Sequence, residues 1–240
     1  MGALRFALLA ASLAAALTSA TGNAEGSIPE LTRAVAVVSS LPGPLVSGYR
    51  PEQGADNAFM HLTLRDDQVA SRCSVTYDPR GEFLQRGAFA ASGLSLAEGA
   101  LFVMLHEKGH CANWSQPRPA TGVGVADKKQ AQLVEDLQDE AFADVYAVLW
   151  MSKLAPEKAD HYLQSVLSLR YDEWYLLAGE AHTHYTVPTL EQLELQDVAL
   201  FGPDEWRGLE PSRILTLAST LSVYSARSYR TALSAPPGMD

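Results

Sequence analysis

Two histidines and a glutamate are grouped in the segment His106-Glu107-Lys108-Gly109-His110. On a helix, residues four apart lie on one face about a turn from each other, so both imidazoles can reach one tetrahedral Zn²⁺. Glu107 lies one position round the helix from His106, where it can exchange protons with a metal-bound water without ligating the metal. This spacing, H-E-x-x-H, predicts a hydrolytic zinc centre.

The segment around this motif has the features of a buried helix. Ser95 and Glu98 form an S-x-x-E capping box, and residues 96–112 contain no proline and are apolar on nearly every side. Buried polar side chains need partners, so the two histidines either bind a metal or form a hydrogen-bonded pair in the core. At about 100° per residue Lys108 points away from both histidines, and we expect it to extend outward to solvent.

A catalytic zinc needs a third protein ligand. The helix predicted over residues 128–154 holds two Glu-x-x-x-Asp pairs, Glu135 with Asp139 and Glu140 with Asp144. On a helical wheel Glu140 and Asp144 fall in the apolar stripe that faces the core, whereas Glu135 and Asp139 fall on the far side. Burying two carboxylates is costly unless a cation or strong donors meet them. We therefore expect Glu140 and Asp144 at the metal, or bound to arginine or backbone amides. Glu135 and Asp139 are expected as solvated surface charges.

The two motifs together resemble those of the gluzincin metallopeptidases, in which H-E-x-x-H is followed on a later helix by E-x-x-x-D, often E-x-x-A-D. Here the second motif reads E-A-F-A-D from Glu140 to Asp144. The resemblance implies that zinc is held by His106, His110 and Glu140. It also implies that Glu107 is the general base and that Asp144 accepts a hydrogen bond from His106. The resemblance covers these two helices only, and the longer metzincin motif is absent.

Many gluzincins add a histidine or a tyrosine that stabilises the tetrahedral oxyanion. The candidates here are His182, His184 and Tyr185. The residues that follow His184 are β-formers and indicate an extended, partly buried setting, so we assign this catalytic role to His184. The alternative is that both histidines are surface or core residues without a part in the chemistry.

The N-terminal residues 1–24 have the composition of a secretory signal. Arg5 supplies the positive charge, residues 6–17 are largely apolar, and small residues that suit cleavage follow. The apolar stretch is too short to span a bilayer. We therefore expect an exported protein, periplasmic or extracellular and without a membrane anchor once the signal is removed, whose residues 25–240 form a single zincin-like metallopeptidase domain.

The formal net charge of the full chain is −10. Nucleic acid requires a basic face, and anionic lipid attracts basic segments, so this acidity argues against both partners. The expected partner is a peptide or protein substrate.

The chain has two cysteines, Cys73 and Cys111. Export makes a disulfide between them feasible, and the bridge would tie the predicted metal helix to an upstream segment. The alternatives are two buried thiols or one free thiol.

The remaining patterns predict an α+β fold, with a small N-terminal antiparallel sheet packed on a mainly helical zincin-like core. Residues 60–64 and 73–77 alternate and carry β-formers. Residues 34–38 fit either a strand or a buried helix. Prolines at positions suited to helix starts predict helices over residues 156–170 and 211–233.

Together these features predict an exported zinc metallopeptidase in which Glu107 acts as general base and the sheet offers an edge to an extended peptide. One alternative is a zinc-dependent hydrolase of a non-peptide bond, which would use the same ligands. Another is a non-catalytic exported binding protein that retains the metal for stability. Glu107 argues against the binding protein, because a structural zinc site closes with four protein ligands and needs no base.

Overall fold

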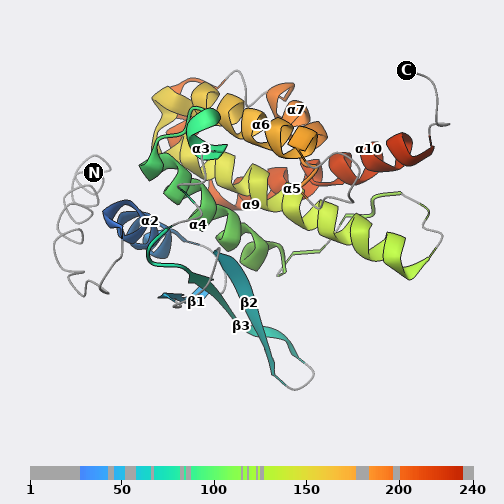
Figure 1. The fold of residues 1–240 in the computed structure, drawn as a ribbon, viewed down its shortest axis with the longest axis horizontal. Coiled ribbons are helices and arrows are strands. Elements are labelled where there is room, and N and C mark those ends of the chain that lie inside the picture. Colours follow the sequence, from blue (N-terminus) through green and yellow to red (C-terminus); the bar gives the residue numbers. More distant parts are fainter. Residues whose placement is uncertain are drawn as a thin grey trace.

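Helices make up most of the molecule, and a small sheet lies against one side of them (Figure 1). The computed structural model describes residues 28–42, 46–51, 58–65, 68–81, 84, 88–114, 116–117, 119–122, 124, 127–176, 184–196 and 201–234. The predicted signal, residues 1–24, lies outside these ranges. None of the helices within them is long and apolar enough to cross a membrane. In chain order the elements are α2 (Pro29–Ser40), β1 (Val46–Pro51), β2 (Phe59–Arg65), β3 (Gln68–Tyr77), α3 (Ala88–Ala91), α4 (Leu96–Asn113), α5 (Lys128–Leu154), η2 (Pro156–Lys158), α6 (Ala159–Leu176), α7 (Val187–Glu194), α8 (Pro203–Gly208), α9 (Pro211–Leu221) and α10 (Val223–Ser234).

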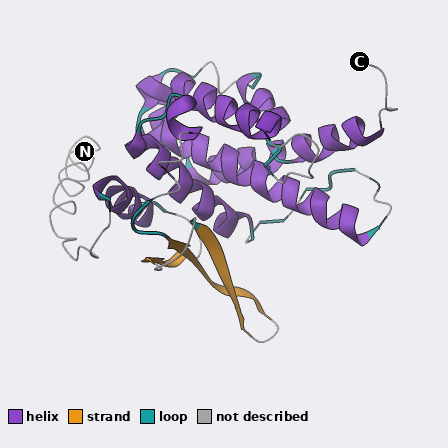
Figure 2. Cartoon of the chain, in the orientation of Figure 1, coloured by secondary structure: helices purple, strands orange, loops and turns teal. Residues whose placement is uncertain are grey.

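The predicted α+β class, a small sheet on a helical core, is confirmed (Figure 2). The sheet is mixed, however, and not purely antiparallel as we predicted. Its strand order is β1-β3-β2, in which β2 pairs antiparallel with β3 and β1 pairs parallel with β3. Because β2 and β3 are separated by only two residues, they can pair only as an antiparallel hairpin. β1 occupies the other edge of β3 and runs parallel to it.

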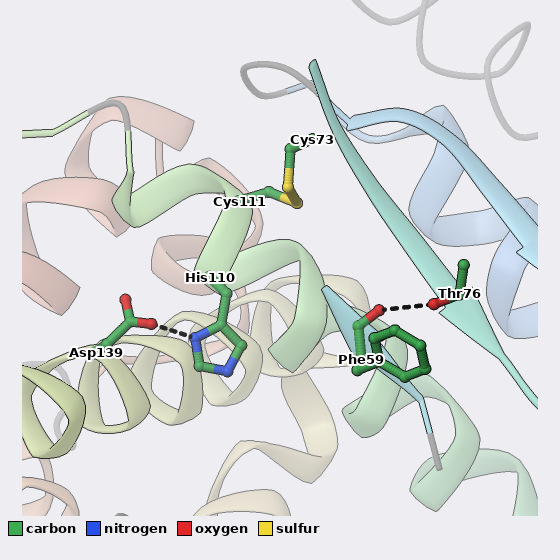
Figure 3. The surroundings of a disulfide bond; sticks show 6 residues. All are labelled: Phe59, Cys73, Thr76, His110, Cys111 and Asp139. Atoms are coloured by element: carbon green, nitrogen blue, oxygen red, sulfur yellow. Dashed lines mark hydrogen bonds and ion pairs between the residues drawn. A yellow bond between two sulfur atoms is a disulfide. The ribbon is translucent and has the colours of Figure 1, made fainter. Parts of the chain in front are cut away.

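The sheet packs on α4 through alternate residues of β3, as a period of two requires. Cys73, Val75 and Tyr77 are all buried in the core. The sulfur of Cys73 is bonded to that of Cys111 on α4, across a Cα–Cα distance of 5.7 Å, which confirms the predicted disulfide (Figure 3). The sheet is therefore attached covalently to α4 at the residue that follows His110.

The helix predicted around the H-E-x-x-H motif is α4. Its N-terminal capping box is formed, since the Ser95 hydroxyl accepts from the amide of Glu98 and the Glu98 carboxylate accepts from the amide of Ser95. These bonds satisfy two amides that the first turn of a helix leaves without partners. The second half of α4 is buried throughout, as its apolar sequence predicted.

Lys108 does not extend to solvent as we predicted. Its side chain is only 3% exposed, and its Nζ donates to the carbonyl oxygens of Val38 at 3.0 Å and Leu41 at 2.8 Å. These carbonyls lie at the C-terminal end of α2, where unpaired oxygens and the helix dipole both attract a cation. Burial lowers the pKa of Lys108 to about 8. The ambiguous residues 34–38 are thus part of a helix that packs on α4.

The predicted helices after the motif are mostly confirmed. α5 has the predicted bounds, and the segment that begins at Pro156 forms a short 3-10 turn, η2, before α6. The helix predicted over residues 211–233 is divided into α9 and α10, which meet at Ser222. α5 is the central helix of the bundle, because α4, α6, α7, α8, α9 and α10 all pack against it.

We expect the double variant Cys73→Ser, Cys111→Ser to be less stable than the wild type. A bridge between residues 38 apart in sequence removes entropy from the unfolded chain, and this is worth about 4 kcal/mol. Urea denaturation followed by circular dichroism measures the free energy of unfolding. Because both sulfurs are buried, the Cys73→Ala, Cys111→Ala variant controls for the polarity of serine. Unchanged midpoints in both variants would contradict the prediction.

Candidate metal centre

The predicted ligands come together between α4 and α5. His106 and His110 face Glu140, and the three residues present ligand atoms that all lie within 4.8 Å of one another. The Nε2 atoms of the two histidines are 3.0 Å apart. Glu140 Oε2 lies 3.2 Å from His106 Nε2, and Glu140 Oε1 lies 3.8 Å from His110 Nε2. A tetrahedral zinc ion with bonds of about 2.0–2.2 Å needs donor atoms about 3.3 Å apart, so these separations fit it.

The two imidazoles are oriented by carboxylates behind them. His106 Nδ1 lies 2.8 Å from Asp144 Oδ1, and His110 Nδ1 lies 2.8 Å from Asp139 Oδ2 (Figure 3 shows the second contact). A carboxylate accepts, so each Nδ1 carries the proton and each Nε2 presents a lone pair. The bond from His106 to Asp144 is the one that the gluzincin resemblance implies.

With each Nδ1 protonated, no proton remains on the atoms that face inward, which are the two Nε2 atoms and the carboxylate oxygens of Glu140. Two Nε2 lone pairs point toward each other, and the Nε2 atoms of His106 and His184 each lie 3.2 Å from Glu140 Oε2. Such an arrangement is repulsive unless a cation lies at its centre or an extra proton enters. Two imidazoles and one carboxylate, closely spaced, form a group that could hold a metal ion.

The pKa values of these groups in the metal-free chain also favour positive charge at the centre of the cluster. Burial lowers the pKa of His106, but the neighbouring carboxylates of Asp144 and Glu140 outweigh it and raise the pKa to about 10. Burial likewise lowers the pKa of His110, and the carboxylate of Asp139 reverses the shift, so that the pKa is raised. Burial raises the pKa of Glu140, but the imidazoles of His106 and His184 hold that pKa well below its usual range. Without metal, protons supply the missing charge, and metal binding releases them.

Asp139 is not the solvated surface charge that we predicted. Its carboxylate holds His110 and also accepts from the side-chain amide of Asn113. Glu135, the other member of that pair, is exposed as predicted. The helical wheel failed for Asp139 because it assigns a single inward face to α5, whereas α4 contacts α5 along two adjoining flanks.

Small residues lie where α4 crosses α5, and they explain why the histidines of α4 contact carboxylates on two flanks of α5. A Cβ atom added to Gly109 would lie 2.8 Å from Cα of Ala143, a distance that real Cβ atoms do not adopt. The backbones therefore approach as closely as glycine allows. Carboxylates on both sides of this contact point, Asp139 and Asp144, can then reach the two histidines of α4.

Asp144 is fully buried and accepts four hydrogen bonds. Besides His106, it receives the Nε and Nη2 of Arg170 at 2.8 and 2.7 Å and the hydroxyl of Thr186. Burial raises the pKa of Asp144, but Arg170 and His106 more than reverse this and leave the pKa far below its usual range. Sequence analysis allowed for an arginine partner but could not single out Arg170, and it gave no signal for Thr186.

Glu107 lies beside the three ligands without joining them. Its side chain is only 8% exposed. Burial raises the pKa of Glu107, while the charges of His106 and His110 oppose the shift. The helix α4 packs against β2, which has β3 on one side and no described strand on its other side. Glu107 therefore lies on the helix that carries two of the candidate ligands and that packs against the edge strand.

Of the three oxyanion candidates, the structure brings His184 to the centre. Its ring is 47% exposed, and its Nε2 lies 3.2 Å from Glu140 Oε2. Its ring centroid is 6.4 Å from that of His106. Tyr185 is half-buried and packs against a small apolar cluster of α5 and α10. His182 lies outside the described residues.

Comparisons with known proteins add no relative to this description. No family model, no curated protein and no solved structure matches the chain. The assignment of this site therefore depends on its own geometry.

We expect the purified protein to bind about one Zn²⁺ per chain, and the His110→Ala variant to lose it, because two donors hold zinc far more weakly than three. Metal analysis after dialysis measures the content. Stoichiometric zinc retained by a His106→Ala, His110→Ala double variant would show that the metal binds elsewhere.

Asp139→Ala should lower zinc affinity about 10–100-fold, because His110 loses the partner that fixes its tautomer and ring orientation. The matched control is Glu135→Ala, one turn earlier on α5, where the carboxylate is exposed and affinity should not change. Competition with a zinc-binding dye measures both affinities. Equal affinities in the two variants would mean that the contact between Asp139 and His110 has no role in binding.

Proposed function

We propose that this chain is an exported, zinc-dependent metallopeptidase of the gluzincin type. The observation that carries the proposal is the position of Glu107, a buried carboxylate that lies next to three convergent ligands and does not belong to them. A purely structural zinc site has no need of such a group. A hydrolytic site needs a base at this place to activate water.

The residues of the chain divide the chemistry among them. His106, His110 and Glu140 would hold zinc, which supplies Lewis-acid activation of water and of the scissile carbonyl. Glu107 accepts the proton of the attacking water and delivers it to the leaving amine. His184, on the open side of Glu140, donates a hydrogen bond to the oxyanion that develops on the substrate.

A peptide is the favoured substrate because of the strand beside Glu107. Among the described residues no strand pairs with the outer edge of β2, and an extended peptide can add to such an edge as a further strand. The helix α4, which carries Glu107, packs against β2, so the base lies on the helix next to this edge strand. A zinc hydrolase of a non-peptide bond would share the ligands but would have no use for the edge.

Export is supported by two features that are independent of the site. The composition of residues 1–24 is that of a secretory signal, and disulfides such as Cys73–Cys111 persist in oxidising compartments. Both features agree with a periplasmic or extracellular location.

We expect Glu107→Gln to abolish most hydrolysis and to leave the fold and zinc content nearly unchanged. Glutamine is similar in shape but cannot take up a proton, and a general base contributes at least about 10²-fold to the rate. The assay is digestion of a broad peptide library by zinc-loaded protein, with Glu135→Gln as a surface control. If the zinc-loaded wild type cleaves no peptide but hydrolyses other esters or amides, the non-peptide alternative replaces this proposal.

A further inference from the structure

The position of the His184 side chain is not fixed by a helix or a strand. It is nearly half exposed, and it lies three residues before α7 begins, outside any helix or strand. An exposed side chain on such a segment samples several rotamers unless contacts fix it. Nevertheless its Nε2 meets Glu140 at 3.2 Å.

Thr186 anchors the backbone of this segment. Its side chain is fully buried, its hydroxyl donates to Asp144 Oδ2, and its amide donates to the carbonyl of His184 at 2.8 Å. Thr186 is the N-cap residue of α7, a position at which a threonine hydroxyl usually accepts from an amide of the first turn. Here it makes no such bond. The hydroxyl is used instead to attach the residue to the carboxylate behind His106.

Glu173 supports the imidazole from the other side. Its Oε2 lies 3.9 Å from His184 Nδ1 and accepts from Arg170 Nη1 at 2.6 Å. The Nε and Nη2 atoms of the same arginine, Arg170, donate to Asp144. The ring of His184 and the backbone that carries it are thus both connected to Asp144.

We propose that Thr186 is a positioning residue, which acts by holding His184 in register with the metal ligands through its bond to Asp144. The carboxylate that orients His106 thereby also fixes the place of the oxyanion donor. The inference rests on the proposed function, in that it gives His184 a catalytic role. It concerns a contact of the chain itself, however, and can be tested without turnover.

The test compares Thr186→Val with Thr189→Val. Valine has the shape of threonine without the hydroxyl, and no helix cap is lost because Thr186 makes none. Thr189 lies one turn further along α7 and is equally buried. Its hydroxyl bonds to Leu221 and Ser225, away from the candidate ligands, so it controls for the loss of a buried hydroxyl. With zinc content unchanged, we expect kcat of Thr186→Val to fall about 10–100-fold with little change in KM, as for a misplaced catalytic group. Thr189→Val should retain wild-type kcat, and Thr186→Ser, which keeps the hydroxyl, should recover most of it.

A His184→Ala background separates positioning of His184 from a general effect through Asp144. If Thr186 acts through His184, Thr186→Val should cause no further loss of kcat in that background. If Thr186→Val lowers kcat in the His184→Ala background as much as it does in the wild type, the proposal is overturned. It is also overturned if Thr186→Ser lowers kcat as much as Thr186→Val does.

The imidazole signals of His184 in nuclear magnetic resonance spectra of the metal-free protein give a readout that needs no activity. We expect Thr186→Val to shift and average these signals, and Thr189→Val to leave them as in the wild type. Signals that respond equally to both variants would refute the positioning role. If the wild type cleaves no peptide but only Thr186→Val changes these signals, the contact stands and the peptidase proposal fails.

Discussion

The close crossing of α4 and α5 is the constraint on which the rest of the site depends. Gly109 and Ala143 allow the two backbones to meet nearly without side chains between them. Each helix then contributes polar residues on both sides of the contact, two histidines from α4 and three carboxylates from α5. A larger residue at the crossing would separate donor atoms that must stay about 3.3 Å apart to share one ion.

The electrostatics of the centre follow from that geometry. Burial by itself disfavours each of these charges, and neighbouring groups of opposite charge, including the guanidinium of Arg170, oppose its effect on their pKa values. Asp144 is the most constrained member, since all its hydrogen bonds are to groups that serve the metal ligands or His184. Oriented ligands of this kind are what distinguishes a metal centre from a chance cluster of polar residues.

Sequence reasoning succeeded where the spacing along one helix decides the result. The distance of four between His106 and His110, and between Glu140 and Asp144, places each pair on one face, and the structure brings the two faces together. The capping box and the bounds of α5 were predictable for the same reason, because they depend on local patterns.

The contacts that were missed join parts of the chain that local patterns do not relate. Lys108 and Asp139 were expected in solvent because a helical wheel represents one helix and not its neighbours. α2 in fact covers the first residue, and the C-terminal end of α4 covers the second. Thr186 contacts Asp144 across 42 positions in sequence, and no periodicity indicates such a pair. The parallel pairing of β1 with β3 joins residues more than 20 positions apart, and the alternation of a strand does not show which neighbour it pairs with.

The bonds from Lys108 to α2 make one helix depend on another. A buried ammonium without acceptors is costly, and the carbonyls of Val38 and Leu41 are the acceptors that α2 supplies. Lys108 lies between His106 and His110 in sequence. The N-terminal helix thus supports the turn of α4 that bears the histidines, although it contributes no side chain to the cluster itself.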